Sequence, residues 1–302
     1  MNQSAEYAAA MARSYLVTEG PIIIGRGALK STVILERGWQ PHGITIRRTL
    51  AGEADVLLMA SYFHPSILRL LISRSENGDL LLDPEWIRGA YFGGKRLRVF
   101  PGKPSFSDMP RAQTAVHVEG GFLASRNGER LFWRFHKNAE GSWALDTVVE
   151  KAFRLPGNRR TAVYSALATP GYFYTVEANR ALTERFWLLR CYEHLEGSRF
   201  RCVAEHRIPE FVYGVAMRPG DSTGLWLITD YRCSGWTHGV WRVELGVPGS
   251  ERLMADGYWG TGIGFLSDKT LVLARYGESH PDPLGGIPGA LVFVPANMVG
   301  EP

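Results

Sequence analysis

The stretch from Gly220 to Gly224 reads Gly-Asp-Ser-Thr-Gly, which satisfies the Gly-x-Ser-x-Gly pattern of serine hydrolases. In such enzymes the serine attacks an acyl carbon from a sharp strand-to-helix turn, with acid and histidine partners nearby. Here Pro219 and Gly220 precede Ser222, and no helical periodicity follows it. Because proline, glycine, aspartate and serine all favour chain reversal, we interpret this stretch as a turn between two strands rather than as a catalytic serine.

The other residues with proton-transfer chemistry, such as His42, Glu177 and Asp230, lie far apart in the sequence. They form a site only if the fold gathers them. After residue 12, short segments rich in Val, Ile, Tyr, Phe and Trp recur every 8 to 12 residues, bounded by Gly, Pro, Asn and Asp. This spacing is typical of an all-β protein.

A longer repeat organises these segments. The similar stretches HGITI, TAVHV, TAVYS, YGVAM and TGIGF begin at residues 42, 114, 161, 213 and 261, at spacings of 72, 47, 52 and 48 residues. A period of about 40 to 50 residues indicates the four-stranded blades of a propeller. We therefore predict an all-β, five-bladed β-propeller that forms a single domain over residues 1–302. The predicted blades span about 42–112, 113–159, 160–210, 211–259 and 260–298.

Two segments fall outside the regular repeat. The segment 31–39, STVILERGW, resembles the fourth strands of the other units, and the fifth unit lacks a fourth strand of its own. We expect this N-terminal strand to complete the last blade and close the ring, which removes an exposed sheet edge. The first unit is longer than the others because of a connection at about 90–113. That connection either caps the axial funnel or packs as a spare hairpin on the rim.

The candidate site is the face on which inner strands begin and second strands end, because that face of a propeller carries the axial funnel. The inner strands begin with His42, Thr114, Thr161, Tyr213 and Thr261. The second strands end with Tyr62, Arg126, Glu177, Tyr231 and Tyr276, preceded by Ser61, Ser125, Val176, Asp230 and Arg275. Since successive strand residues point to opposite faces, only one of the last two sets can point into the funnel.

The polar and charged residues at these strand ends differ from blade to blade. This favours one asymmetric site over a pocket that is repeated in each blade. We expect proton transfer from Glu177, His42 and Tyr231, since carboxylates, imidazole and phenols are general acids and bases. Arg126 would clamp an anion. The remaining predicted substrate-binding residues are Tyr62, His64, Tyr213, Asp230, Arg275 and Tyr276. Structural roles stay open: an inter-blade ion pair for either arginine, a turn cap for Asp230 and an inter-blade hydrogen bond for His42.

Composition limits the partners. The net charge is +4 and no basic run exceeds two or three residues, so the sequence lacks the signature of a nucleic-acid-binding protein. No apolar run approaches the roughly 18 to 20 residues of a membrane span, and the N-terminal stretch lacks the apolar core of a signal peptide. We expect a cytoplasmic protein with a small-molecule ligand and no organic cofactor. We assign no metal ligands, because no spacing supports a metal site, but a metal ion held in the funnel by His42, His64 and Asp230 stays open as an alternative.

The three cysteines are Cys191, Cys202 and Cys233. A two-residue hairpin turn at Glu196 and Gly197 would place Cys191 directly opposite Cys202. In the expected cytoplasmic setting we predict reduced thiols rather than a disulfide.

In period and strand pattern, residues 31 to 298 or so resemble five-bladed propeller proteins, a group that includes inverting glycoside hydrolases and lectins. The resemblance implies the fold and, for the glycosidases, carboxylates at the starts of inner strands in different blades. His42, three threonines and Tyr213 occupy those positions here, which departs from a two-carboxylate mechanism. Two functions therefore stay open. One is an acid–base hydrolase, lyase or cyclase acting on a small polar or anionic molecule, and the other is a non-catalytic module that binds a ligand or a protein.

Overall fold

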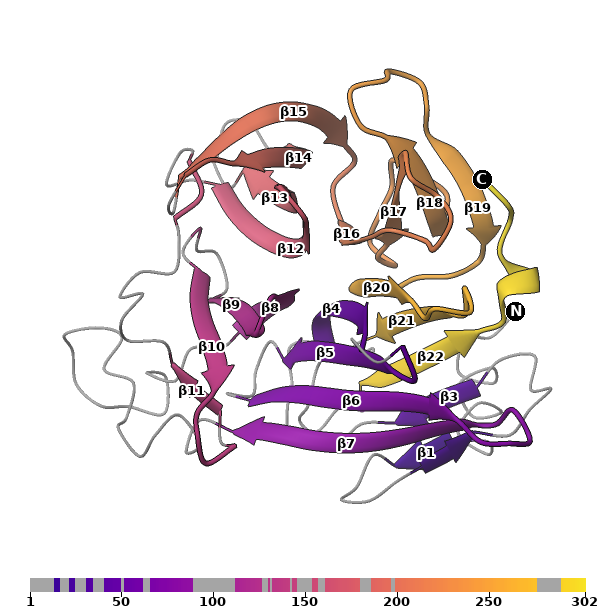
Figure 1. Ribbon diagram of the computed structural model, residues 1–302. Helices are drawn as coiled ribbons and strands as arrows, with labels where there is room; N and C mark the ends of the chain where they lie inside the picture. The colour runs from indigo at the N-terminus through magenta and orange to yellow at the C-terminus, as the bar shows by residue number, and fades with distance from the viewer. Residues whose placement is uncertain are drawn as a thin grey trace.

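The structure is a computed structural model of the chain. It describes residues 14–16, 22–24, 31–34, 41–49, 52–61, 66–88, 112–126, 130, 132–141, 143–145, 154–156, 161–179, 186–196, 199–275 and 289–302. Five β-sheets stand around a common centre in chain order, as the blades of a propeller (Figure 1). No α-helix occurs in these described residues. The predicted all-β, five-bladed propeller is therefore confirmed.

The strands are named below from the centre of the ring outwards. Blade 1 contains β4 (Pro41–Arg48), β5 (Asp55–Ser61), β6 (Ser66–Arg74), β7 (Leu80–Arg88) and β2 (Ile22–Ile24). Blade 2 contains β8 (Ala112–Val118), β9 (Gly121–Arg126), β10 (Phe132–Lys137) and β11 (Trp143–Leu145). Blade 3 contains β12 (Thr161–Thr169), β13 (Tyr172–Asn179), β14 (Trp187–His194) and β15 (Phe200–Ile208). Blade 4 contains β16 (Val212–Ala216), β17 (Gly224–Thr229), β18 (Gly239–Glu244) and β19 (Arg252–Asp256). Blade 5 contains β20 (Gly262–Phe265), β21 (Leu271–Arg275), β22 (Ala290–Val294), β3 (Ser31–Ile34) and β1 (Ser14–Leu16), and the 3-10 helix η3 (Ala296–Met298) follows β22.

The inner and outer strands of a blade differ in burial. Every residue of β16, β17, β20 and β22 is buried, because neighbouring blades cover both faces of these strands. Their sequences accordingly read as continuous apolar runs rather than as an alternation. The outer strand β15 is mostly exposed. Apolar side chains pack between adjacent blades, as where Trp226 of blade 4 meets Phe265 of blade 5 edge to face with ring centroids 5.2 Å apart. The core is therefore a series of layers between blades.

The ring closes between the two ends of the chain. Strand β3 pairs antiparallel with β22, with Ile34 opposite Ala290, so the N-terminal segment completes blade 5 as predicted. Blade 5 is joined to blade 1 by the buried carboxylate of Asp55, which accepts bonds from the backbone N–H and the hydroxyl of Ser267 at 2.9 and 3.0 Å. The predicted connection at 90–113 lies almost wholly outside the described residues.

Two outermost strands were not predicted. Strand β1 pairs parallel with β3, and β2 pairs antiparallel with β7, so blades 1 and 5 each gain a fifth strand. Each of these strands has three residues. An apolar run this short carries no periodicity that would separate it from a loop, which is why only the paired structure reveals it. Both strands cover outer edges of their sheets, which are otherwise open to pairing.

Four of the five inner strands have a register shift near their start. The shifts fall between Pro41 and Ile44, Ala112 and Thr114, Val163 and Ser165, and Tyr213 and Ala216. An extra residue at such a bulge turns the local side chains away from the regular alternation. The inner strands therefore depart from regular two-fold alternation at these positions.

The two turns considered from the sequence differ in outcome. The stretch around Ser222 is a turn between β16 and β17, as predicted, and it is organised by Asp221. The Asp221 carboxylate accepts bonds from the backbone of Gly224 at 2.9 Å, from Trp226 Nε1 at 2.9 Å and from Arg242 Nε at 2.7 Å. A Cβ at Gly224 would collide with the side chains of Asp221 and Arg242, so a larger residue at this position would displace this ion pair.

The two-residue turn that was considered at Glu196 and Gly197 is not formed. His194 pairs with Phe200, which leaves a five-residue loop, and a bulge follows in β15. Cys191 consequently lies opposite Ala204, whereas Cys202 lies opposite Tyr192. Both cysteines are free thiols, as is Cys233.

Candidate functional site

Three aromatic rings from three blades meet across the centre of the ring. His42 comes from β4, Tyr164 from β12 and Tyr213 from β16. The centroid of the His42 ring lies 5.2 Å from that of Tyr213 and 5.9 Å from that of Tyr164, and the two tyrosine rings are 5.5 Å apart. Blade 1 is a neighbour of neither blade 3 nor blade 4, so these contacts span the axis.

Trp187, the first residue of β14, joins this group. Its ring stacks on Tyr164 with centroids 4.8 Å apart and planes inclined by 22°, and it meets Tyr213 edge to face at 4.8 Å. We call His42, Tyr164, Trp187 and Tyr213 the axial cluster. Such stacked and edge-to-face arrangements are the favoured geometries of aromatic pairs, so the rings hold one another in place and present an imidazole and two phenols at the axis.

The carboxylate of Asp230 anchors an arginine to the axial cluster. Asp230 is fully buried, and its Oδ1 accepts bonds from the backbone N–H and from Nε of Arg232, at 2.9 and 2.7 Å. Arg232 Nη2 in turn donates to the phenol oxygen of Tyr213 at 3.1 Å. The backbone bond shows the turn-capping role that the sequence left open for Asp230, and the second bond shows that this cap also fixes a guanidinium.

Arg232 belongs to a line of aromatic rings and guanidinium groups in contact with one another. Its Cζ lies 4.6 Å from the ring centroid of Phe211 and 5.6 Å from that of Tyr231. The Tyr231 ring meets Trp259 edge to face at 5.6 Å, and the Cζ of Arg275 lies 4.7 Å from the ring centroid of Trp259. We call Phe211, Arg232, Tyr231, Trp259 and Arg275 the arginine–aromatic row. Guanidinium groups are attracted to ring faces at these distances.

The backbone of Phe211 is strained. Its φ is +62°, a left-handed conformation that bulky residues rarely adopt. Its carbonyl accepts a hydrogen bond from the Asp230 N–H at 2.8 Å, and its ring lies 5.8 Å from that of Trp187. Phe211 therefore links the axial cluster to the other members of the arginine–aromatic row. Strained residues of this kind concentrate at functional sites.

The protonation state of Tyr213 follows from its environment. Burial raises its pKa well above the usual value, and the neighbouring Arg232 only partly opposes that rise. The phenol therefore keeps its proton at all physiological pH values. Because a phenol both donates and accepts, Tyr213 accepts from Arg232 while keeping a proton to donate.

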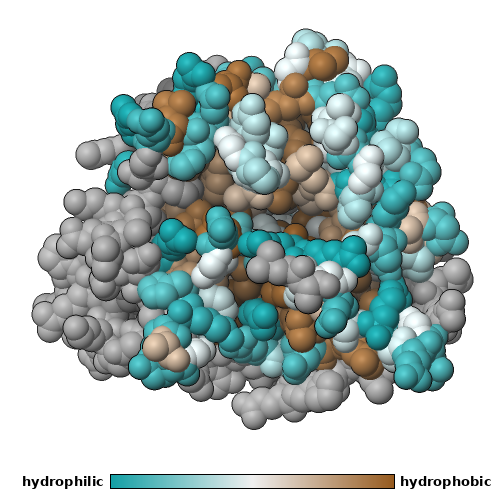
Figure 2. All heavy atoms as spheres, viewed as in Figure 1, coloured by the Kyte–Doolittle hydropathy of each residue, from teal (hydrophilic) through white to brown (hydrophobic). Residues whose placement is uncertain are grey.

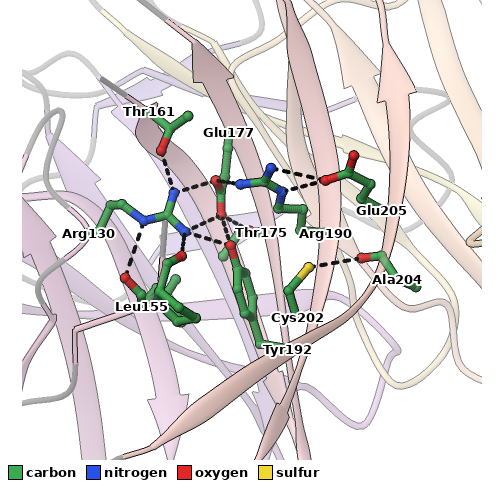
Figure 3. Close-up of polar contacts among 11 residues, drawn as sticks. Arg130, Leu155, Thr161, Thr175, Glu177, Arg190, Tyr192, Cys202, Ala204 and Glu205 are labelled. Carbon is green, nitrogen blue, oxygen red and sulfur yellow. Dashed lines mark hydrogen bonds and ion pairs between the residues drawn. The ribbon is translucent and has the colours of Figure 1, made fainter. Parts of the chain in front are cut away.

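Glu177, the predicted catalytic carboxylate, lies between blades 2 and 3 rather than in the axial cluster (Figure 3). It is fully buried, and its two oxygens contact the guanidinium groups of Arg130 and Arg190. Tyr192 Oη donates to its Oε1 at 2.6 Å, and Thr175 Oγ1 does so at 2.8 Å. Both oxygens are thus saturated by donors.

The same group of contacts fixes Arg130. Its Nη1 donates to Thr161 Oγ1 at 2.8 Å, and its Nε donates to the carbonyl of Leu155 at 3.3 Å (Figure 3). Although burial opposes its charge, Glu177 raises the pKa of Arg130. Burial also raises the pKa of Tyr192, with a further contribution from Glu177. This Glu177 network couples blade 2 to blade 3 as a buried charge network, in which each charge is balanced.

The predicted site residues are distributed as follows. The structure places His42 and Tyr213 in the axial cluster and Tyr231 and Arg275 in the row. Asp230 is bound to Arg232 of the row, and Glu177 lies apart from both groups. Arg126 ends β9 opposite Ala112, but its side chain lies outside the described part of the structure. Tyr62, His64 and Tyr276 also lie outside the described residues. The assigned catalytic and binding roles of all these residues stay predictions.

Sequence reasoning missed Arg232, Phe211, Trp259, Tyr164 and Trp187. Arg232 directly follows the predicted pair Asp230–Tyr231, and Phe211 precedes the predicted inner strand by two residues. Including the residues next to the predicted positions would therefore have found both. Tyr164 gave no such signal, because it reaches the axis only through the bulge between Val163 and Ser165.

Neither a metal centre nor a membrane helix is found in the part of the chain that the structure describes. No group of three His, Cys, Asp or Glu side chains is arranged to hold a metal ion among those residues. Since His64 lies outside them, the set His42, His64 and Asp230 is not tested. No described helix is long and apolar enough to cross a membrane.

Figure 2 shows one face of the molecule, on which the coloured residues of the outer part are mostly hydrophilic and a recess near the middle is bordered by both hydrophobic and hydrophilic residues.

Comparison with known proteins gives a weak similarity only. No protein-family model and no curated protein matches the chain. A candidate 6-phosphogluconolactonase from Bacteroides uniformis is similar at 9% identity and a TM-score of 0.39, over 79% of this chain and 71% of that one. Another from Bacteroides fragilis has 13% identity and a TM-score of 0.40, over 75% and 62% of the two chains. A sucrose-6-phosphate hydrolase from Lactobacillus gasseri has 11% identity and a TM-score of 0.44, over 85% and 60%. The chain thus spans less than two thirds of the last two proteins, and these values assign no activity to it.

Proposed function

We propose that this protein is an enzyme that binds a small polar or anionic molecule at the axial cluster and acts on it by acid–base chemistry, as a hydrolase, lyase or cyclase without an organic cofactor. The observation that carries the proposal is the meeting of His42, Tyr164 and Tyr213 from three separate blades. A buried imidazole beside two phenols is an arrangement in which protons can be delivered and removed.

His42 is the proposed general acid–base, because imidazole is the side chain whose ordinary pKa lies nearest neutrality. Tyr213 is the proposed hydrogen-bond donor to a ligand oxygen, since its phenol stays protonated and is fixed by Arg232. Asp230 orients Arg232 and does not reach the ligand in this scheme, because it is fully buried against that arginine. Glu177 is assigned to holding blades 2 and 3 together.

The second candidate is a binding module without catalysis, and one observation favours it. Both carboxylates that the sequence offered for proton transfer, Glu177 and Asp230, are fully buried and paired with arginines. The partly exposed aromatic groups of the arginine–aromatic row would then bind a ligand that the protein does not transform.

The test is turnover of a defined panel of probes by the whole chain: aldonolactones, sugar phosphates and nitrophenyl glycosides, followed by proton release and nitrophenol absorbance. His42→Gln is expected to lower kcat/KM by about 100-fold or more, the range of a lost general acid–base. The matched control is His194→Gln, because His194 lies at the far end of β14 and is exposed. Equal loss in both variants, or full activity in His42→Gln, would reject the assignment, and turnover of none of the probes by a protein that binds them would favour the second candidate.

A further inference from the structure

The position of Arg232 is determined from four directions. Asp230 holds Nε, Tyr213 contacts Nη2, and the rings of Phe211 and Tyr231 lie beside the guanidinium plane. Even so, 34% of the side chain is exposed, whereas its partner Asp230 is fully buried. An arginine side chain that is fixed by its surroundings and still partly exposed is pre-organised to bind, because little side-chain entropy is lost when an anion arrives.

A second guanidinium lies in the same row as Arg232. The arginine–aromatic row carries two guanidinium groups, Arg232 and Arg275, which are linked through Tyr231 and Trp259. Arg232 also forms an ion pair with Asp230. Arginine recognises the oxygens of carboxylates and phosphates through its planar fork, so an oxyanion is the ligand group that fits this surface.

Phe211 supplies an independent observation. Lys269 is the one other non-glycine residue with positive φ among the described residues, and its φ is +68°. Lys269 lies in the turn between β20 and β21, where its N–H donates to the Leu266 carbonyl as part of ordinary turn geometry. Phe211 also lies in a turn, between β15 and β16, but its carbonyl accepts from Asp230 in a different turn of the blade. In this strained conformation, the Phe211 ring centroid lies 4.6 Å from Cζ of Arg232 and 5.8 Å from the centroid of the Trp187 ring.

We infer that Arg232 is the oxyanion-binding group of the axial site, and that the strained Phe211 is a positioning residue that holds its guanidinium against the axial cluster. The inference rests on the proposed function, and it names the ligand class of that site: molecules that carry a carboxylate or a phosphate. The ligand's oxyanion would lie on Arg232, with the reacting part directed toward His42 and Tyr213.

The experiment measures the binding of inorganic phosphate and of citrate by titration calorimetry at low ionic strength, on the full chain. Two probes are used because either anion satisfies the shared chemistry, and their relative affinities distinguish a phosphate ligand from a carboxylate ligand. Arg232→Gln is expected to lower the affinity for the more tightly bound of the two anions by about ten-fold or more. Arg201→Gln is the matched control, because Arg201 is 65% exposed and pairs with Glu193 on β14. It should leave the affinity unchanged.

The role of Phe211 needs variants that separate binding from stability. Phe211→Tyr keeps the ring and should bind the anion as the parent protein does. Phe211→Leu keeps bulk but loses the ring face, so we expect an affinity several-fold lower at an unchanged Tm. Phe211→Gly removes both the ring and the backbone strain. It should lower the affinity for the anion, whereas the relief of strain should limit the fall in Tm. Lys269→Gly relieves equivalent strain in the turn and should raise Tm with no effect on binding.

Each outcome decides a part of the inference. Unchanged affinity in Arg232→Gln, or no binding of either anion by the parent protein, overturns the oxyanion site. Equal affinities in Phe211→Leu and Phe211→Tyr overturn the positioning role. If His42→Gln abolishes turnover while Arg232→Gln binds normally, this inference fails and the proposed function stands. If Arg232 proves necessary for binding and no probe is turned over, the proposed enzyme fails and the oxyanion site stands.

Discussion

Arg190 Nη1 lies 2.9 Å from Oε2 of Glu177, and the glutamate side chain is fully buried. Arg130 contacts the same carboxylate from the other side, so two guanidinium groups share one anion between blades 2 and 3 (Figure 3). This carboxylate is the charged partner of the buried Arg130 guanidinium, and leaving a buried charge without its partner is strongly destabilising.

Replacing Glu177 by Gln is therefore expected to lower the free energy of unfolding by about 3 to 5 kcal/mol. The measurement is equilibrium denaturation in urea. The control is Glu205→Gln, because Glu205 also pairs with Arg190 but is 54% exposed, and an exposed pair contributes less than about 1 kcal/mol. If the two variants lose the same stability, the Glu177 network does not couple the blades.

The turn at 220–224 allows a direct test of the serine-hydrolase motif. Asp221→Asn removes the charge that Arg242 and Trp226 contact, and we expect a loss of about 3 kcal/mol in the free energy of unfolding. Ser222 is exposed, and Ser222→Ala should change stability by less than about 0.5 kcal/mol and leave any turnover intact. A Ser222→Ala variant that folds normally and loses turnover would restore the catalytic interpretation.

Asp221 also predicts how this turn responds to acid. Although burial by itself raises the pKa of a carboxyl group, the bonds from Arg242, Gly224 and Trp226 hold the pKa of Asp221 well below its usual value. The folded state therefore keeps this carboxylate ionised after free aspartate has begun to protonate. Its stabilisation is complete above the ordinary aspartate pKa and is lost progressively as the pH falls below that value toward the lower pKa of the folded state. Asp221→Asn should accordingly reduce the acid dependence of stability below about pH 4.

His117 makes stability depend on pH at milder acidity. Burial lowers its pKa from 6.5 to about 4, aided by Arg47 and Arg69 and opposed by its hydrogen bond to the Val56 carbonyl at 2.8 Å. Between these two values the unfolded chain binds a proton that the folded chain does not, so the stabilisation is complete above pH 6.5 and falls toward pH 4. The loss is at most about 3 kcal/mol. His117→Gln should flatten the dependence of the denaturation midpoint on pH in this range.

Gly214 tests the bulge that brings Tyr213 to the axis. Its φ is +61°, and a Cβ there would lie 2.7 Å from Ile263 Cγ2 and 3.0 Å from the Ile263 nitrogen. Gly214→Ala should lower the free energy of unfolding by roughly 2 kcal/mol or more, from strain and overlap together. Gly171 also has positive φ, at +81°, but a Cβ at that position would meet nothing within 4 Å, so Gly171→Ala measures the strain alone, at about 1 kcal/mol. Similar losses in the two variants would show that Ile263 can move aside.

Much of the architecture follows from the sequence. The segments beginning at His42, Thr114, Thr161, Tyr213 and Thr261 are the inner strands or border them, and β3 closes blade 5 where STVI predicted it. The repeat makes the fold predictable, because every blade buries β-branched and aromatic residues at a similar spacing along the chain.

The candidate site was only partly predictable, for reasons visible at two residues. Glu177 occupies the predicted ring position, yet the sequence does not show which side of β13 faces blade 2, and the partners that saturate its oxygens come from β14 and from Arg130 in the preceding blade. Tyr164 lies in mid-strand by sequence and reaches the axis because a bulge inserts an extra residue before Ser165. A shift of one residue reverses which way each side chain points.

The sequence by itself thus determined the fold, the number of blades and the closing strand, because these depend on periodic burial that every unit repeats. Only the tertiary structure decided that His42, Tyr164 and Tyr213 meet, that Arg232 is held by Asp230 and Phe211, and that Glu177 lies elsewhere. These relationships depend on contacts between residues from different blades, set by bulges and by how one blade packs on the next, and no local pattern in the chain encodes such contacts.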